Sequence, residues 1–165
     1  MNELPVRIVV ADASPLIGLA KIGRLTLLQQ LVLQILIPGA VEKELCLDSM
    51  RPGSKILAEA KRDGWLVSAQ VGEVPHHLTA TVNLGEAEAI TLAKQESALL
   101  LIDESKGRVA ASSEGVRIFG TGVVLIRAKS LDLIPTVAEP LKALSEVGYH
   151  FSLGLQQEIL RRAGE

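Results

Sequence analysis

Short apolar runs alternate along the chain with longer amphipathic segments. The runs are four to six residues long and rich in Val, Ile and Leu, which predicts strands at 6–11, 34–37, 65–69, 98–102 and 116–119. Apolar positions spaced three or four residues apart predict helices at 14–23, 25–32, 38–47, 54–64, 84–96, 104–115, 122–131, 137–148 and 152–165. Strands separated by helices are joined by right-handed crossovers. The pattern therefore predicts an α/β fold, a three-layer α/β/α domain with a parallel sheet of about five strands.

Length and composition agree with this pattern. A chain of 165 residues, 48% of them hydrophobic, is large enough for one domain over residues 1–165 with a substantial core. Aromatic residues make up only 2%, so we expect an aliphatic core. The longest apolar region, 25–40, is interrupted by Gln29, Gln30 and Gln34. This interruption indicates a buried helix followed by a strand and not a membrane span.

Net charge and cysteine content limit the kinds of partner and the cellular compartment that we expect for this protein. A net charge of −2 means that a nucleic-acid partner would need a local basic patch or binding through a metal. Cys46 is the only cysteine, so no intrachain disulfide forms, as is typical of a reducing compartment. Residues 1–7 lack the apolar core of a signal peptide. These features predict a soluble cytoplasmic protein.

Two acidic residues follow predicted strands directly. Asp12 follows the first strand and Asp103 the fourth, and ligands of parallel sheets bind beyond the carboxyl ends of the strands. Ser14 followed by Pro15 predicts the N-cap and first residue of the next helix, which leaves Asp12 free for chemistry. For Asp103 the structural alternative is equally good, since it would cap a helix beginning at Glu104.

Two further acids lie on helices that can lean over the same edge. Glu86 stands three residues after Asn83, and this capping-box spacing is a sufficient structural explanation for the acid. Glu86 also shares a helix face with Ile90, however, and an acid on a buried face needs a partner or a metal. Its neighbour Glu88 is expected to be solvated. On the preceding helix Glu44 is favoured over Glu42, because Glu44 lies beyond the strongest effect of the helix dipole.

Clustered carboxylates repel one another unless a cation lies among them. Oxygen ligands without cysteine suit a hard cation, so Asp12, Glu44, Glu86 and Asp103 together predict a Mg²⁺ or Mn²⁺ site.

The chain resembles a PIN-domain protein of the VapC-like kind. The matching stretches cover nearly the whole chain in order: "VVADASPLIGLAKIGRLTLL", "LIPGAVEKEL", "LGEAEAITLA", "LLLIDESKGRVAA", "IFGTGVVLIRAKS" and "GYHFSLGLQQEILRRAGE". The resemblance implies that the catalytic acids are Asp12, Glu44, Glu86 and Asp103. Asp12, Glu86 and Asp103 would hold the metal, Glu44 would complete the pocket through water, and Ser14 and Thr121 would be supporting polar groups.

The same resemblance implies a metal-dependent endoribonuclease, the toxin of a type II toxin–antitoxin pair. Its partners would be an RNA substrate, a small antitoxin protein and a second copy of the chain. One departure is visible, because such members usually carry a larger apolar residue after the threonine, where this chain has Gly122.

Other interpretations stay open. One is a catalytically weak PIN-like scaffold or regulatory protein that keeps the acids. The other is a Mg²⁺-binding phosphoacceptor signalling domain, although the chain lacks paired acids after the first strand and has Thr121 where a lysine is needed after the last.

Four remaining features are expected to be minor. His76 and His77 are expected to be solvated. Lys106 and Arg108 fit a phosphate contact and a solvated helix face equally well. Arg161 and Arg162 suit the end of the last helix. In that helix Leu155 and Ile159 form an apolar stripe that is expected to be buried in the protein's own core, the alternative being a contact with a second copy or an antitoxin.

Overall fold

The sheet contains five parallel strands. The computed structural model describes residues 8–165, with strands β1 (Ile8–Ala11), β2 (Gln34–Ile37), β3 (Leu66–Ser68), β4 (Leu99–Leu101) and β5 (Ile118–Phe119). Their order is β3-β2-β1-β4-β5. Val10 of β1 is in register with Leu36 of β2 on one side and Leu100 of β4 on the other. Each predicted strand is therefore present; residues 6 and 7 of the first lie outside the described residues.

Helices connect the strands in sequence. They are α1 (Ala13–Lys21), α2 (Thr26–Leu31), α3 (Gly39–Leu45), α4 (Ser54–Arg62), α5 (His76–Thr79), α6 (Leu84–Gln95), α7 (Ser105–Ser113), α8 (Thr121–Ser130), α9 (Ala138–Glu146) and α10 (Leu153–Arg162). All predicted helices are confirmed; most are shorter than predicted, and α1 and α8 begin one residue earlier. The short α5 was not predicted, because its four residues carry no repeating apolar pattern. None of the helices in residues 8–165 combines the length and apolar character needed to cross a bilayer.

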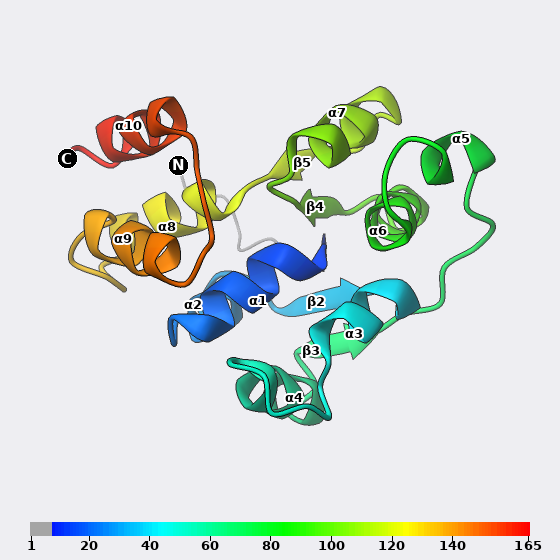
Figure 1. The fold of residues 1–165 in the computed structure, drawn as a ribbon, viewed down its shortest axis with the longest axis horizontal. Coiled ribbons are helices and arrows are strands. Elements are labelled where there is room, and N and C mark those ends of the chain that lie inside the picture. The colour runs from blue at the N-terminus through cyan, green and yellow to red at the C-terminus, as the bar shows by residue number, and fades with distance from the viewer. Residues whose placement is uncertain (1–7) are drawn as a thin grey trace.

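The direction of the crossovers reverses at the centre of the sheet. From β1 the chain moves outward to β2 and β3, and it then returns across the sheet to β4 and β5. Right-handed connections therefore place the two sets of helices on opposite faces. The first set is α1–α4 and the second is α5–α7. Figure 1 shows α5, α6 and α7 on one side of the molecule and α8, α9 and α10 on the other, where α8 packs against α2 and α9 against α1. The three-layer α/β/α prediction is confirmed, and the switch point lies between β1 and β4.

The central strands are apolar throughout because helices cover both faces of the sheet. Val9, Val10 and Ala11 of β1 are fully buried, as are Leu100 and Leu101 of β4. Continuous apolar runs are typical of such buried parallel strands. Because both faces of these strands are buried, a polar side chain can reach solvent or a ligand only at the carboxyl edge of the sheet, where β1 and β4 end.

The last helix docks mainly on α8. Ile159 is only 4% exposed, and a Cβ atom placed on Gly122 would lie 2.6 Å from its Cδ1 atom. The absence of a side chain at Gly122 thus makes room for Ile159. This contact gives a structural role to the glycine that this chain has where VapC-like proteins usually carry a larger apolar residue. Leu155 is 44% exposed. The prediction of a buried stripe is right for Ile159 and wrong for Leu155, because only the row of α10 that faces α8 is covered.

This contact predicts the effect of adding one methyl group. Gly122→Ala should lower the free energy of unfolding by about 1–3 kcal/mol, since the methyl must displace Ile159 in a close-packed layer. Gly154→Ala in α10 is the matched control. Nothing lies within 4 Å of a Cβ there, so alanine should be neutral or stabilising by up to about 1 kcal/mol. Urea denaturation of both variants measures the difference, and equal stabilities would contradict the packing described here.

Candidate functional site

Asp12 lies at the carboxyl end of β1, beside the end of β4. Its backbone N–H donates to the Leu101 carbonyl at 3.0 Å, which extends the strand pairing by one residue. The residue is in the N-cap position of α1, but its side chain accepts no capping hydrogen bond. Ser14 was predicted to be that cap, and this is wrong: α1 begins one residue earlier, at Ala13, and Ser14 is exposed in its first turn. Asp12 is nevertheless free of a capping role.

Asp103 is held by hydrogen bonds from the C-terminal third of the chain. Its Oδ1 accepts from the Thr121 backbone N–H at 2.9 Å, and its Oδ2 accepts from the Thr121 hydroxyl at 2.5 Å and from the Tyr149 hydroxyl. The cap of α7 is Glu104, whose carboxylate accepts from Gly107 N–H at 3.0 Å. The capping alternative for Asp103 is therefore wrong.

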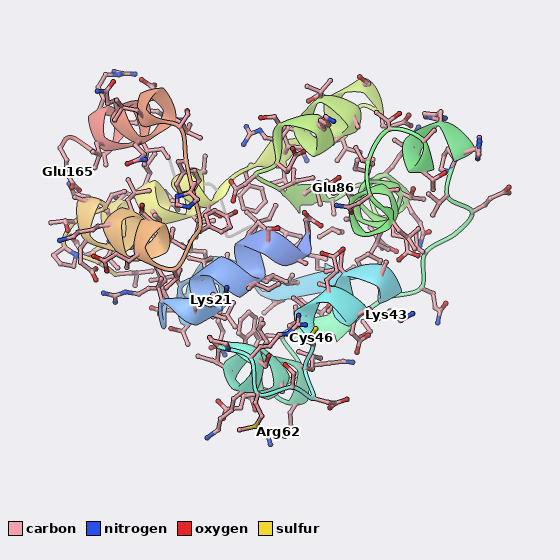
Figure 2. All side chains as sticks on the ribbon, in the orientation of Figure 1. Lys21, Lys43, Cys46, Arg62, Glu86 and Glu165 are labelled. Carbon is pink, nitrogen blue, oxygen red and sulfur yellow. The ribbon has the colours of Figure 1, made fainter. Side chains whose placement is uncertain are left out.

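Glu86 is confirmed as part of a capping box and is also buried. Its backbone N–H donates to Asn83 Oδ1 at 2.8 Å, and its carboxylate accepts from Asn83 N–H at 3.2 Å. The side chain is 5% exposed and lies in the middle of the molecule, whereas Arg62 lies at the rim (Figure 2). Burial raises the pKa of Glu86, and Asp12 and Glu104 raise it further.

Glu88, which was expected to be solvated, is instead partly buried. It accepts a hydrogen bond of 2.8 Å from the backbone N–H of Ala40, in the first turn of α3. The expectation failed because α3 packs against α6, a contact that the local pattern of α6 cannot reveal.

The two acids of α3 have different surroundings. Glu42 pairs with Lys61 and accepts from the Ser68 hydroxyl at 2.5 Å, so its charge is compensated. Glu44 is exposed, and its carboxylate lies against Gly85 at the start of α6, where a side chain would collide with it. Burial raises the pKa of Glu44, and the neighbouring charge of Glu86 adds to this effect. Of the two acids, Glu44 is therefore the one that lies beside Glu86.

Five carboxylates share the carboxyl edge, and we refer to them as the acidic cluster: Asp12, Glu44, Glu86, Asp103 and Glu104. Burial raises the pKa of Asp12 to about 6, offset in part by the Ala13 backbone N–H and reinforced by the charges of Glu44, Asp103 and Glu104. Within residues 8–165, no lysine or arginine forms an ion pair with any of the five. The cluster thus holds more negative charge than the described residues compensate, although the charge of Lys106 lowers the pKa of Glu86 in part.

The donor chemistry of the acidic cluster fits a hard divalent cation. All its ligand atoms are carboxylate oxygens, which suit Mg²⁺ or Mn²⁺. As the side chains stand, residues 8–165 contain no group of three histidine, cysteine or acidic residues close enough together to hold an ion. Shared coordination therefore requires side-chain rotation. Glu44 is exposed and has room for it, whereas Glu86 and Asp103 are held by hydrogen bonds.

Sequence reasoning missed two residues near Asp103. Glu104 carries a signal, since it is a second acid directly after Asp103, but an acid at that position is equally typical of the start of a helix. Tyr149 had no local signal, because it reaches Asp103 across 46 residues of sequence.

The remaining candidates lie outside the acidic cluster or at its border. His77 is exposed and contacts Glu114 at 2.5 Å on the surface. Lys106 is exposed. Arg108 is closer to the site, since a Cβ placed on Gly120 would lie 2.9 Å from its Nη1 atom and 2.6 Å from Asp103 Oδ1. A depression of about 650 Å³ between α3 and α6 is lined in part by Glu44.

Comparison with known proteins agrees with the geometry. The sequence matches the PIN-domain family over residues 8–165. PIN domains are typically nucleases that act on nucleic acids and usually use divalent metals. No protein among the curated ones matches this chain. The parallel five-stranded sheet has the architecture of that fold, and the match extends over every residue that the structure describes. The chain belongs to the PIN-domain family.

Proposed function

We propose that the protein is a metal-dependent endoribonuclease, with Asp12, Glu86 and Asp103 holding one or two Mg²⁺ or Mn²⁺ ions. The observation that carries this proposal is the convergence of five carboxylates at the switch point of the sheet, none of them in an ion pair with a lysine or arginine of residues 8–165. Two of the five, Asp12 and Glu86, are buried, and buried carboxylates close to other acids are stabilised in their ionised form by a cation.

The residues of the cluster have distinct tasks. A bound divalent cation would stabilise charge on the scissile phosphate and make a coordinated water more acidic. Glu86, whose carboxylate accepts from Asn83 N–H, would supply a fixed oxygen ligand at the base of the site. Asp12 has a backbone held by the β1–β4 pairing and a side chain without a capping hydrogen bond, so it would rotate towards the ion. Glu44 lies on α3, which packs against α6, and is exposed. It can therefore reach a water on the solvent side of the site and accept its proton.

The neighbouring acids of α3 provide a matched test of this proposal. Glu44→Gln should lower the rate of RNA cleavage by about 10–100-fold, as expected for loss of a residue that acts on the metal through water. Glu42→Gln should leave the rate within about 2-fold, because Glu42 is engaged with Lys61 away from the cluster. Single-turnover cleavage of a labelled RNA in Mn²⁺ measures both, and equal losses in the two variants would contradict the proposal.

The RNA backbone would be contacted by Arg108 at the border of the site. Arg108→Ala should raise the KM for RNA several-fold and make the salt dependence of binding shallower by about 0.7–1 in logarithmic slope, with kcat little changed. Arg117→Ala is the control, since Arg117 precedes β5 and thus lies at the opposite edge of the sheet from Gly120. An identical change of slope in both variants would show that Arg108 makes no particular contact.

We further propose that this nuclease is a VapC-like toxin that forms one domain over residues 1–165, resides in the cytoplasm, and pairs with a small antitoxin protein. The support is the resemblance of the quoted stretches to such proteins. Induced expression in a bacterial host should arrest growth, and Asp12→Asn should relieve the arrest. Light scattering of the purified chain should give the mass of a homodimer. Growth arrest by both the unmodified protein and Asp12→Asn would favour a binding or scaffold role over cleavage.

A further inference from the structure

One oxygen of Asp103 has both of its hydrogen-bonding positions filled. Asp103 Oδ2 accepts from two hydroxyls, those of Thr121 and Tyr149, whereas among residues 8–165 the sole donor to Oδ1 is the Thr121 backbone N–H. An ionised carboxylate has about four lone-pair sites, two on each oxygen. Oδ2 therefore has none left for a metal, and Oδ1 has one.

We propose that Tyr149 is a positioning residue that, together with Thr121, closes Oδ2 of Asp103 to the metal, so that Asp103 coordinates through Oδ1 alone and the site favours Mg²⁺ or Mn²⁺ over Ca²⁺. This inference rests on the metal-dependent function proposed above. It adds a residue and a selectivity that the acidic cluster by itself does not imply.

The ring of Tyr149 is fixed by close packing. A Cβ placed on Gly18 of α1 would lie 2.9 Å from its Cδ2 atom, so the ring fits only because position 18 has no side chain. Phe151 packs edge-on against it, with ring centroids 5.3 Å apart at 61°. The backbone N–H of Tyr149 donates to Leu144 at 2.9 Å. The hydroxyl is thus presented to Asp103 by a rigid support.

The hydroxyl also stays a donor. The phenol of a tyrosine is ordinarily neutral at physiological pH. A neutral phenol donates its single proton, and Asp103 is the acceptor that the geometry provides.

The number of oxygens that Asp103 can offer affects which ion binds. Mg²⁺ and ions like it require near-octahedral coordination, usually with each carboxylate contributing one oxygen, whereas Ca²⁺ takes six to eight oxygens and accepts both oxygens of one carboxylate. An Asp103 limited to Oδ1 suits the first class. Removal of one hydroxyl from Oδ2 opens the second oxygen and should favour Ca²⁺.

Isothermal titration with Mn²⁺ and with Ca²⁺ tests this inference on the full chain. The unmodified protein should bind Mn²⁺ more tightly, and Tyr149→Phe should raise the ratio of the Ca²⁺ to the Mn²⁺ association constant by about 10-fold. Phe151→Leu is the control. It loosens the packing but keeps the hydroxyl, so the ratio should stay within about 2-fold.

The outcomes separate this inference from the proposed function. An unchanged ratio in a folded Tyr149→Phe variant, while the unmodified chain binds Mn²⁺ and cleaves RNA, would overturn the role of Tyr149 alone. Failure of the unmodified chain to bind Mn²⁺ would overturn both proposals. If Tyr149→Phe does not fold, Thr121→Val tests the same point, since it removes the other hydroxyl from Oδ2 while keeping the backbone N–H. Its ratio should rise as well, and an unchanged ratio there would overturn the inference.

Discussion

Asp12→Asn should stabilise the metal-free protein and abolish its nuclease activity. In the folded state the pKa of Asp12 is raised from 3.8 to about 6, because its carboxylate is buried among other acids. At neutral pH the ionised side chain therefore costs about 3 kcal/mol of stability. Asparagine is nearly the same shape and carries no charge, so most of that cost should disappear. The same change removes a metal ligand, and cleavage should fall by at least about 10²-fold.

Urea denaturation in EDTA at pH 7.5 measures the stability of this variant. Asp63→Asn is the control, because Asp63 is exposed at the end of α4, and its replacement should change the free energy of unfolding by less than about 0.5 kcal/mol. A destabilised Asp12→Asn protein that still cleaves RNA would show that Asp12 serves the fold and not the chemistry.

The metal-free protein should lose stability as the pH rises, with the largest loss between about pH 4 and pH 7. Asp12, Glu44 and Glu86 all have a raised pKa in the folded state. A raised carboxyl pKa means that the folded state binds more protons than the unfolded state in this window. The free energy of unfolding then falls with pH, and Asp12 alone contributes about 3 kcal/mol to that fall.

A bound cation should reverse this trend. Mn²⁺ binds the ionised carboxylates of the folded state, so at 100 times its dissociation constant it should add about 2.7 kcal/mol at pH 7.5. It should add much less at pH 5, where Asp12 is protonated. Denaturation between pH 4.5 and pH 8, in EDTA and in Mn²⁺, gives both curves. A free energy of unfolding that rises with pH in EDTA, or that does not change when Mn²⁺ is added, would contradict a site of mutually repelling carboxylates.

The fold could be predicted from the sequence because strands covered on both faces leave an unmistakable pattern. The strands at 34–37 and 98–102 are continuous apolar runs, and the acids that follow β1 and β4 stand out against them. The order of the strands then brings Asp12 and Asp103 to one edge. Glu86 could be recognised because an acid on a buried helix face is unusual.

What could not be predicted depends on contacts between distant segments. Tyr149 reaches Asp103 only because the α9–α10 connection passes Gly18 of α1. The exposure of Leu155 depends on which row of α10 meets Gly122, and no local periodicity reveals that. The cap at Ser14 was predicted from residue preference, whereas the strand pairing of Asp12 sets the actual start of α1.

Metal-dependent cleavage of RNA by the purified chain is the most direct test of the acidic cluster. The unmodified protein, Asp12→Asn and Glu42→Gln, all purified in parallel, are incubated with an end-labelled single-stranded RNA in EDTA, Mg²⁺ or Mn²⁺. The unmodified protein and Glu42→Gln should cleave only with a divalent cation, while Asp12→Asn should be inactive throughout. Cleavage that persists in EDTA, or that is equal in Asp12→Asn, would contradict a metal-dependent centre built on these carboxylates.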